Sequence, residues 1–354
     1  MIINQNFIGG NIPVKSMEGN TVYLENQIRD TTEDWFYWAF AVEGAKGRTI
    51  KFQFDKNVRV GYFGAAKSYD LKSWEWTGKW DDERSFTYTF GENEDKVYFA
   101  HNMIYSPEMF TDFCNAKDIE IKTLCRSEKG RDIPYIELGN GEEVIFLTSR
   151  HHACESTGTY VLQGFIEKYL EAPLPGLRII AVPFVDYDGV VDGDQGKARA
   201  PHDHNRDYPR DGESIYSSTR KIRETAHVNK IRFAFDFHAP WHFGGENDTV
   251  FIVRNSHEKL HEIERFGQYL QNSITPDSLP YKIENDHAPD TTWSKTTSPT
   301  FANYMLNTMK AELAFTLETA YFDAQGTQFS QKRAIELGKC FAEAFRKYIG
   351  STKK

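Results

Sequence analysis

The chain of 354 residues is long enough for one large domain or two of ordinary size, and its 40% hydrophobic and 26% charged residues are typical of a globular protein. The formal net charge of −9 argues against nucleic acid as the main partner, because phosphate binding depends on clustered lysine and arginine. The sequence has no apolar run of about 18 residues, so we expect no membrane-spanning segment and no membrane partner.

The N-terminus and the cysteines favour a reducing cytoplasm. Residues 1–16 lack the basic start and the long apolar core of a secretory signal. The four cysteines have no paired spacing, which indicates neither a disulfide framework nor a thiolate zinc site; they are Cys114, Cys125, Cys154 and Cys340. We therefore expect a cytoplasmic protein, and nothing in the sequence indicates an oligomeric state.

Residues 1–122 are expected to form a small antiparallel β-sandwich domain. Short aromatic and β-branched runs, as at 35–40, 49–54 and 86–90, alternate with turn-like breaks. Three tryptophans in this half could form a sugar-binding face, but we favour packing in the core and against a second domain; they are Trp74, Trp76 and Trp80.

The second half, 123–354, alternates between strand-like and helix-like segments, after a connecting helix at 106–113 and a hairpin at 119–136. Strands are expected at 144–149, 177–184, 231–238, 249–254 and 312–318, and helices at 157–171, 214–228, 256–272, 300–309 and 329–348. This alternation predicts an α/β domain in which a mixed, mostly parallel sheet is flanked by helices on both faces.

A candidate metal half-site follows the first of these strands. His152-x-x-Glu155 comes directly after the apolar strand 144–149, and α/β enzymes place their chemistry in such turns because the turns lie at the carboxyl edge of the sheet. Imidazole nitrogen and carboxylate oxygen together suit a zinc ion. The pattern alone is weak, since a second one, His261-x-x-Glu264, lies on an amphipathic helix and is most simply a solvated face.

Further candidates stand at the ends of two later strands. His238 ends the apolar strand 231–238 at the same edge of the sheet and would be the third ligand, although a lone buried histidine more often is simply hydrogen-bonded. His242 competes for this role but lies beyond the break at Pro240. Two histidines and one carboxylate would leave a fourth zinc position for water, as in catalytic sites. Glu318 ends the last strand, where it is positioned as a base, and a metal with a carboxylate base predicts a hydrolase.

The loop at 186–208 has no apolar periodicity, and loops of this length in compact domains usually have a function. Arg206 can hold a carboxylate in a bidentate manner, with the amide of Asn205 beside it. Arg199 or Lys197 could polarise a scissile carbonyl. Each of these charges, taken alone, would equally suit a solvated loop.

Together these motifs resemble the zinc metallocarboxypeptidases, specifically the cytosolic carboxypeptidase branch, over nearly the whole chain. The motifs that carry the resemblance are His152-x-x-Glu155, Asp188-Gly189, Asp203-x-Asn205-Arg206, Asp236-x-His238 and Thr316-x-Glu318. Their order and rough intervals agree with the family. The branch also has a β-sandwich in front of its catalytic domain, so the resemblance implies the same two-domain fold here.

The resemblance implies one zinc ion per chain, a glutamate base and a binding site for the carboxylate of a peptide terminus. The implied zinc ligands are His152, Glu155 and His238, and the implied base is Glu318. Asn205 and Arg206 would hold the carboxylate, and Asp203 would orient His152. Arg199 would polarise the carbonyl, with Lys197 as the alternative, and Tyr304 would be the phenol that closes over the substrate. Two features depart from the family. Ala153-Cys154 stands where many members have glycine before the glutamate, and 298–304 contains no arginine, which argues against a preference for terminal glutamate.

The predicted function is that of a zinc-dependent hydrolase that removes C-terminal residues from peptides or proteins, with Glu318 as the general base. One alternative is a zinc amidase or deacylase acting on N-acyl amino acids or cell-wall peptides, which the preceding β-sandwich disfavours. Another is a catalytically inactive glycan-binding protein, against which the intact Glu318 argues. The sequence is compatible with a protein, a peptidoglycan peptide or a small amide as substrate.

Overall fold

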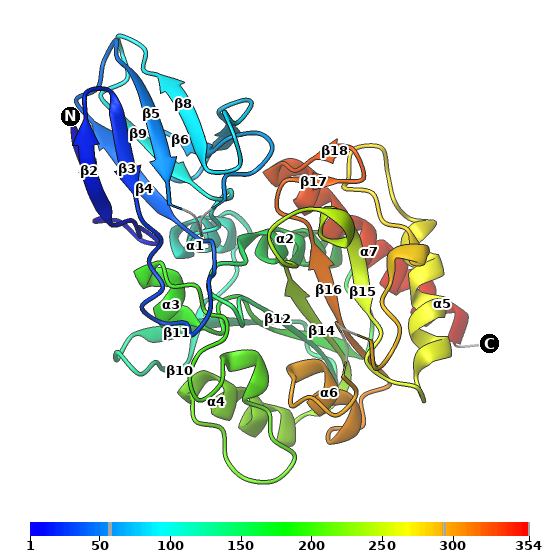
Figure 1. Ribbon diagram of the computed structural model, residues 1–354. Helices are drawn as coiled ribbons and strands as arrows, with labels where there is room; N and C mark the ends of the chain where they lie inside the picture. Colours follow the sequence, from blue (N-terminus) through cyan, green and yellow to red (C-terminus); the bar gives the residue numbers. More distant parts are fainter. Residues whose placement is uncertain (56–58, 292, 294, 353–354) are drawn as a thin grey trace.

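The computed structural model describes residues 1–55, 59–291, 293 and 295–352. It contains two N-terminal sheets and one large C-terminal sheet flanked by helices, and Figure 1 shows the N-terminal sheets, in blue and cyan, standing beside the larger α/β body. This arrangement confirms the predicted fold class. Among the described residues, no helix combines the length and the apolar character needed to cross a membrane.

The N-terminal half is a sandwich of a five-stranded and a four-stranded sheet. The first has the order β1 (Ile2–Asn4), β4 (Ala39–Glu43), β9 (Lys96–Ala100), β6 (Ala66–Ser68) and β7 (Trp74–Trp76); the second has the order β2 (Val14–Glu18), β3 (Thr21–Leu24), β5 (Thr49–Phe54) and β8 (Ser85–Thr89). Inward-facing aromatic side chains such as Phe52 and Phe99 pack between the sheets, with their rings 5.5 Å apart. The pairs are antiparallel except β3 with β5, which run parallel.

The three tryptophans lie in the core or at the junction of the two halves. Trp74 is buried in a hydrophobic cluster that also includes side chains of the α/β domain. The indole of Trp76 donates a hydrogen bond to the main-chain oxygen of Phe329 over 2.9 Å, and Trp80 packs edge-on against Phe243. These contacts favour the core and interface interpretation over a sugar-binding face.

Helix α1 (Pro107–Ala116) connects the two halves. Its N-terminus is capped by Ser106, whose hydroxyl accepts a hydrogen bond from the main-chain NH of Met109. One hydrophobic cluster runs from the N-terminal sheets through α1 into the α/β domain, so the two halves share a continuous core. The domain boundary at residue 122 stays a prediction.

The C-terminal sheet has seven strands with a parallel centre. Its order is β10 (Lys122–Arg126), β11 (Asp132–Leu138), β13 (Leu177–Val182), β12 (Glu143–Ser149), β14 (Lys230–His238), β16 (Leu313–Thr319) and β15 (Val250–Val253). Strands β13, β12, β14 and β16 are parallel, and β10, β11 and β15 run antiparallel to their neighbours. The central strands are nearly continuous apolar runs because both faces are covered by helices.

Helices cover both faces of this sheet. One face carries α2 (Ser156–Glu171), α5 (Leu260–Gln271) and α7 (Gln331–Thr352), and the other carries α4 (Ser217–His227) and α6 (Phe301–Asn307). The remaining short elements are α3 (Tyr187–Asp192), the 3-10 turns His204–Arg206, Gly245–Asp248 and Ile283–Asn285, and the hairpin of β17 (Asp323–Ala324) and β18 (Thr327–Gln328). The elements predicted in this half are present, with ends that differ by a few residues.

Candidate active site

The carboxyl edge of the parallel strands brings together side chains that are far apart in the sequence. His152 and Glu155 follow β12, and His238 ends β14, the adjacent parallel strand. Helix α2 starts immediately after Glu155 and lies very close to β14, since a Cβ at Gly158 would be 2.5 Å from the main-chain oxygen of Phe237. The glycine therefore permits the close approach that places the Glu155 carboxylate against His238.

Three donor atoms of these residues converge on one point in a pocket. The Nδ1 atom of His152 lies 2.9 Å from Oε1 of Glu155, and the Nδ1 atom of His238 lies 2.7 Å from Oε2. The three ligand atoms all lie within 4.8 Å of one another. All three residues line the same pocket, and Glu155 and His238 are almost fully buried.

The outer nitrogens of both histidines face carboxylates. Nε2 of His238 lies 2.7 Å from Oδ2 of Asp236, and Nε2 of His152 lies 3.5 Å from Oδ1 of Asp203. Burial opposes the charged form of His238, but Asp236 and Glu155 outweigh it and raise its pKa well above the ordinary value. Each carboxylate accepts a hydrogen bond from the Nε2–H of its histidine. The Nδ1 atom of each ring then faces the centre of the cluster, where its unprotonated form can bind a metal.

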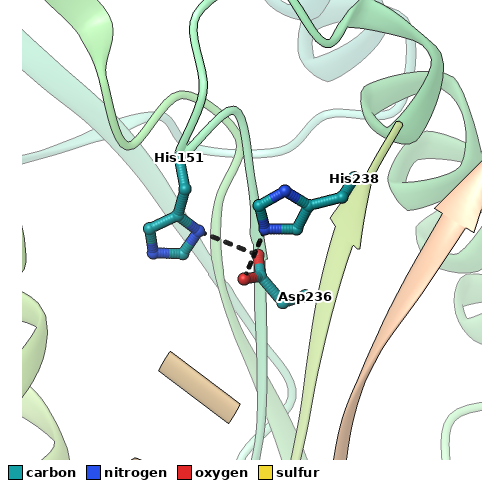
Figure 2. A group of neighbouring side chains, drawn as sticks. All are labelled: His151, Asp236 and His238. Atoms are coloured by element: carbon teal, nitrogen blue, oxygen red, sulfur yellow. Dashed lines mark hydrogen bonds and ion pairs between the residues drawn. The ribbon is translucent and has the colours of Figure 1, made fainter. Parts of the chain in front are cut away.

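Sequence reasoning missed His151, a second histidine in the same turn. Figure 2 shows Asp236 between His151 and His238, with Nδ1 of His151 2.9 Å from Oδ1 of Asp236. Nε2 of His151 faces the hydroxyl of Tyr208 at 2.7 Å. His151, Asp236 and His238 also lie close enough together for a metal, but His151 and Asp236 are fully buried and are absent from the described lining of the pocket. We interpret them as the support that orients His238.

Glu318 lies on β16, in register with His238 on β14. It is buried, it lines the same pocket as the three clustered side chains, and its Oε2 atom has no hydrogen-bond partner. Burial raises its pKa to about 7, because desolvation penalises the carboxylate more than the neighbouring His238 favours it. This group can exchange a proton near neutral pH, as a general base must.

The structure distinguishes the two cations of the long loop. Lys197 is buried in the pocket, with its Nζ 2.5 Å from Oε1 of Glu155 and 4.6 Å from the centre of the Trp35 ring. Arg199 does not line this pocket, and the expectation that it polarises the carbonyl stays a prediction. Its guanidinium instead pairs with three carboxylates at 2.8–3.3 Å, which are Asp186, Asp30 and Asp194.

Asn205 and Arg206 also line the pocket. They lie in a 3-10 turn that begins at Asp203, whose Oδ1 accepts a hydrogen bond from the main-chain NH of Asn205 over 2.9 Å. Asn205 is buried, and its Oδ1 accepts from the main-chain NH of Phe301 at the start of α6. The Arg206 side chain is exposed, so its guanidinium can meet a ligand that enters from solvent.

Two other expected residues lie elsewhere. The Tyr304 side chain is buried, and its hydroxyl is 2.8 Å from Nε2 of His227. It lines a different depression from the one that contains His152, and the expectation that it closes over the substrate stays a prediction. His242 is buried among aromatic rings, and its Nε2 bonds to the main-chain oxygen of Arg59.

The second His-x-x-Glu pattern is a surface feature, as expected. The side chain of His261 on α5 is 86% exposed, and no donor set for a metal is formed there among the described residues. By contrast, sequence reasoning missed two aromatic side chains that line the pocket, Trp35 from the N-terminal half and Trp293 from the loop before α6. Nothing in the local sequence around Trp35 indicates that it reaches the catalytic edge of another domain.

The proteins that resemble this chain include several that are named carboxypeptidases. Residues 3–101 match the cytosolic carboxypeptidase N-terminal domain. The chain is 23% identical to an uncharacterized protein of Zymomonas mobilis, over 96% of this chain and 94% of that protein. It is 22% identical to cytosolic carboxypeptidase 2 of Macaca fascicularis over 56% of this chain, and the match spans only 26% of that relative.

Among solved structures, a metallo-carboxypeptidase from Burkholderia cenocepacia has the same fold, with a TM-score of 0.83, 18% identity and coverage of 99% of both chains. This likeness extends over the N-terminal sheets as well as the α/β domain. It agrees with the N-terminal family match and with the cytosolic carboxypeptidase relatives. The chain therefore has the fold of this metallo-carboxypeptidase, and its N-terminal part is similar to the cytosolic carboxypeptidase N-terminal domain.

Proposed function

We propose that the chain is a zinc-dependent carboxypeptidase that removes C-terminal residues from peptides or proteins. The observation that carries the proposal is the convergence of His152, Glu155 and His238 within 4.8 Å in a pocket that Glu318 and Arg206 also line. A metal-binding centre, a carboxylate base and a cation for the terminal carboxylate thus share one pocket. Each is a part that hydrolysis at a peptide C-terminus requires.

The residues at the centre fit a zinc ion. Two imidazole nitrogens and one carboxylate are a donor set that catalytic zinc sites use, and they leave a further position open. The chain holds the two rings in place through Asp236 and Asp203, as is usual for histidines that bind metals. A bound zinc ion would supply a Lewis acid that polarises a carbonyl and lowers the pKa of a water molecule to about 7.

Glu318 would take the proton from the attacking water. Glu318 lines the pocket, its buried Oε2 atom has no hydrogen-bond partner, and the register of β16 against β14 fixes its position. Once protonated, Glu318 can deliver that proton to the nitrogen of the leaving amino acid, so one carboxyl group serves both halves of the reaction.

Lys197 would take the role of the carbonyl-polarising cation in place of Arg199. Its ammonium group is buried at the centre of the site, whereas Arg199 is engaged by its three carboxylates. Burial would lower the pKa of Lys197, but Glu155 outweighs this effect and raises it, so the group remains charged. A fixed positive charge at this position stabilises negative charge on the carbonyl oxygen in the transition state.

Arg206 and Asn205 would bind the terminal carboxylate. An arginine side chain can donate two parallel hydrogen bonds to a carboxylate, and a neighbouring amide adds a further donor. This contact would require a free C-terminus. The proposed substrate partner is accordingly the C-terminus of a peptide or protein, and the four free cysteines suit the reducing cytoplasm that we propose as the location.

The test combines metal analysis with peptide trimming. We expect the purified chain to contain one zinc ion and to shorten peptides with free C-termini, read out by mass spectrometry. Matched peptides with amidated C-termini should resist, because they lack the carboxylate that Arg206 binds. Trimming of both sets at equal rates, or cleavage only of N-acyl amino acids, would favour an amidase or deacylase instead.

A further inference from the structure

The inner wall of the pocket lies next to Glu318 and consists of neutral side chains. Thr316 precedes Glu318 by two residues on β16, so both side chains point to the same face of the sheet. Val253 on β15 is in register with Thr316, and Asn255 follows two residues later. Asn303 from α6 completes this wall, and all of these residues line the pocket.

Hydrogen bonds determine which way the two asparagine amides point. The Nδ2 of Asn303 donates to the main-chain oxygens of Lys295 and Ser298, over 2.9 and 2.8 Å. Carbonyl oxygens accept only from the amide nitrogen, so the Oδ1 of Asn303 must face the other way. There it accepts from the Nδ2 of Asn255 over 2.8 Å, and the orientation of Asn255 is fixed in turn.

The Oδ1 of Asn255 is consequently left without a partner. Asn255 is 5% exposed, and its Oδ1 atom is buried and makes no hydrogen bond. Leaving a buried acceptor unpaired is unfavourable, and a bound donor would remove this cost. A ligand group that enters this part of the pocket is therefore favoured if it carries an N–H or O–H directed at Asn255.

Charge limits which donors are suitable. The described residues of this inner wall include no acidic side chain, and the Glu318 beside it is the proposed base, so a buried ammonium or guanidinium paired with Glu318 would oppose proton transfer. A carboxylate would place its oxygens against the lone pairs of the Asn255 Oδ1 atom. Lys295 lines the pocket too, but it is exposed, so solvent screens its attraction for an acidic group. A neutral donor, a carboxamide or a hydroxyl, fits best.

We infer that the C-terminal residue of the substrate has a carboxamide or hydroxyl side chain, which donates a hydrogen bond to Asn255. This inference rests on the proposed function, since it takes Arg206 and Asn205 as the anchor for the terminal carboxylate. With the carboxylate held there, the side chain of the same residue is directed into the remaining space, toward Asn255 and Thr316.

Binding of the released amino acid tests the inference without relying on turnover. The purified zinc-bound chain would be titrated by calorimetry with glutamine, serine, glutamate, lysine and leucine, each of which has the free carboxylate that Arg206 requires. Of glutamine and serine, we expect the one that binds better to have a Kd at least about tenfold lower than that of glutamate, lysine or leucine. This factor is what one additional hydrogen bond to the buried Asn255 acceptor should contribute. Tighter binding of glutamate, lysine or leucine, or no measurable binding of any of the five, would overturn the inference.

Substitutions connect the preference to Asn255. Asn255→Leu has a similar size and no acceptor, so we expect the discrimination between amino acids to fall to within about twofold. Asn255→Asp adds a carboxylate to the wall and should make lysine the preferred ligand. An unchanged preference in both variants would contradict the assignment to Asn255. The matched control is Asn11→Leu, which removes another buried amide with an unpartnered Oδ1 that does not line the pocket, and it should leave the preference unchanged.

Peptide trimming keeps the two proposals separate. If the chain selects glutamine or serine in the binding assay but shortens no peptide, the proposed function fails while the pocket preference stands. If it trims peptides and prefers terminal glutamate, lysine or leucine in both assays, the proposed function stands and the inference about Asn255 is wrong.

Discussion

His238 and Glu318 lie opposite each other, in register, on the adjacent parallel strands β14 and β16. One residue belongs to the donor cluster, and the other has a buried carboxylate oxygen without a partner. Their spacing is therefore set by the main-chain hydrogen bonds of the sheet and not by a flexible loop.

The first prediction concerns the base. Glu318→Gln should retain zinc but reduce kcat by roughly 10²–10⁴-fold, because an amide cannot accept the proton of the attacking water. Elemental analysis and peptide-trimming kinetics would measure the two effects. Full activity in this variant would show that another group is the base.

The raised pKa of Glu318 also has a consequence for stability. Its ordinary carboxyl value is 4.5 and its value in the folded, metal-free protein is about 7, so the folded state binds the proton more tightly than the unfolded chain. The free energy of unfolding of the metal-free protein should therefore decrease as the pH rises from 4.5 to 7, through this group. Glu318→Gln should remove that part of the pH dependence, which urea unfolding at several pH values would reveal.

The second prediction concerns the ligands. Zinc added to the chelator-treated protein should raise its melting temperature, because an ion that binds only the folded state stabilises it. His152→Ala should abolish both the shift and the bound zinc. The matched control is His261→Ala, which alters the exposed His-x-x-Glu pattern on α5 and should leave both unchanged. Loss of zinc in the control variant, or its retention in His152→Ala, would contradict the assigned site.

The third prediction separates the two cations of the loop. Lys197→Met should lower kcat/KM by roughly 10²–10³-fold, since it removes a charge that stabilises the developing oxyanion. Arg199→Met should act mainly on stability, because it leaves three carboxylates, those of Asp30, Asp186 and Asp194, without their shared partner. Kinetics and thermal unfolding of both variants would test this difference. The prediction is wrong if Arg199→Met folds as stably as the unaltered chain and is the less active of the two.

The fourth prediction concerns acid sensitivity at the junction of the two halves. Burial lowers the pKa of His101 to about 3, and burial together with His101 lowers that of the neighbouring His242, whose ring is 4.8 Å away. Both residues are neutral in the folded state, so their contribution to stability is complete above the ordinary value of 6.5 and is lost as the pH falls toward 3. His101→Phe should make the unfolding free energy less dependent on pH between 6.5 and 4, as measured by urea unfolding. An unchanged slope would count against this assignment.

The fold and the strand-end residues of the site can be predicted from the sequence, whereas the positions of the loop residues cannot. The order of the motifs predicts which residues stand at the strand ends, and parallel strands end at a common edge of the sheet. In the structure His152, Glu155, His238 and Glu318 do line one pocket at that edge. These roles stay predictions until the variants are measured.

Residues on loops were harder to place from the sequence. Lys197 and Arg199 are two positions apart, and which one faces the pocket depends on the pairing of Arg199 with Asp30 of the N-terminal half, a contact across 169 positions. The position of Tyr304 depends on the hydrogen bond between its hydroxyl and His227, which lies 77 positions earlier in the sequence, on α4. Such pairings leave no periodic signal in the local sequence, so motif and pattern cannot reveal them.

Trp35 has a consequence for how this protein can be dissected. Its ring belongs to the N-terminal half, yet it stacks against the Lys197 ammonium inside the pocket. A fragment that starts at residue 123 would lack this contact, and it would also expose core side chains such as Tyr160, whose ring packs against Tyr105. The N-terminal half thus contributes the Trp35 side chain to the pocket, so exchanging this half with that of a relative should alter which ligands the pocket binds.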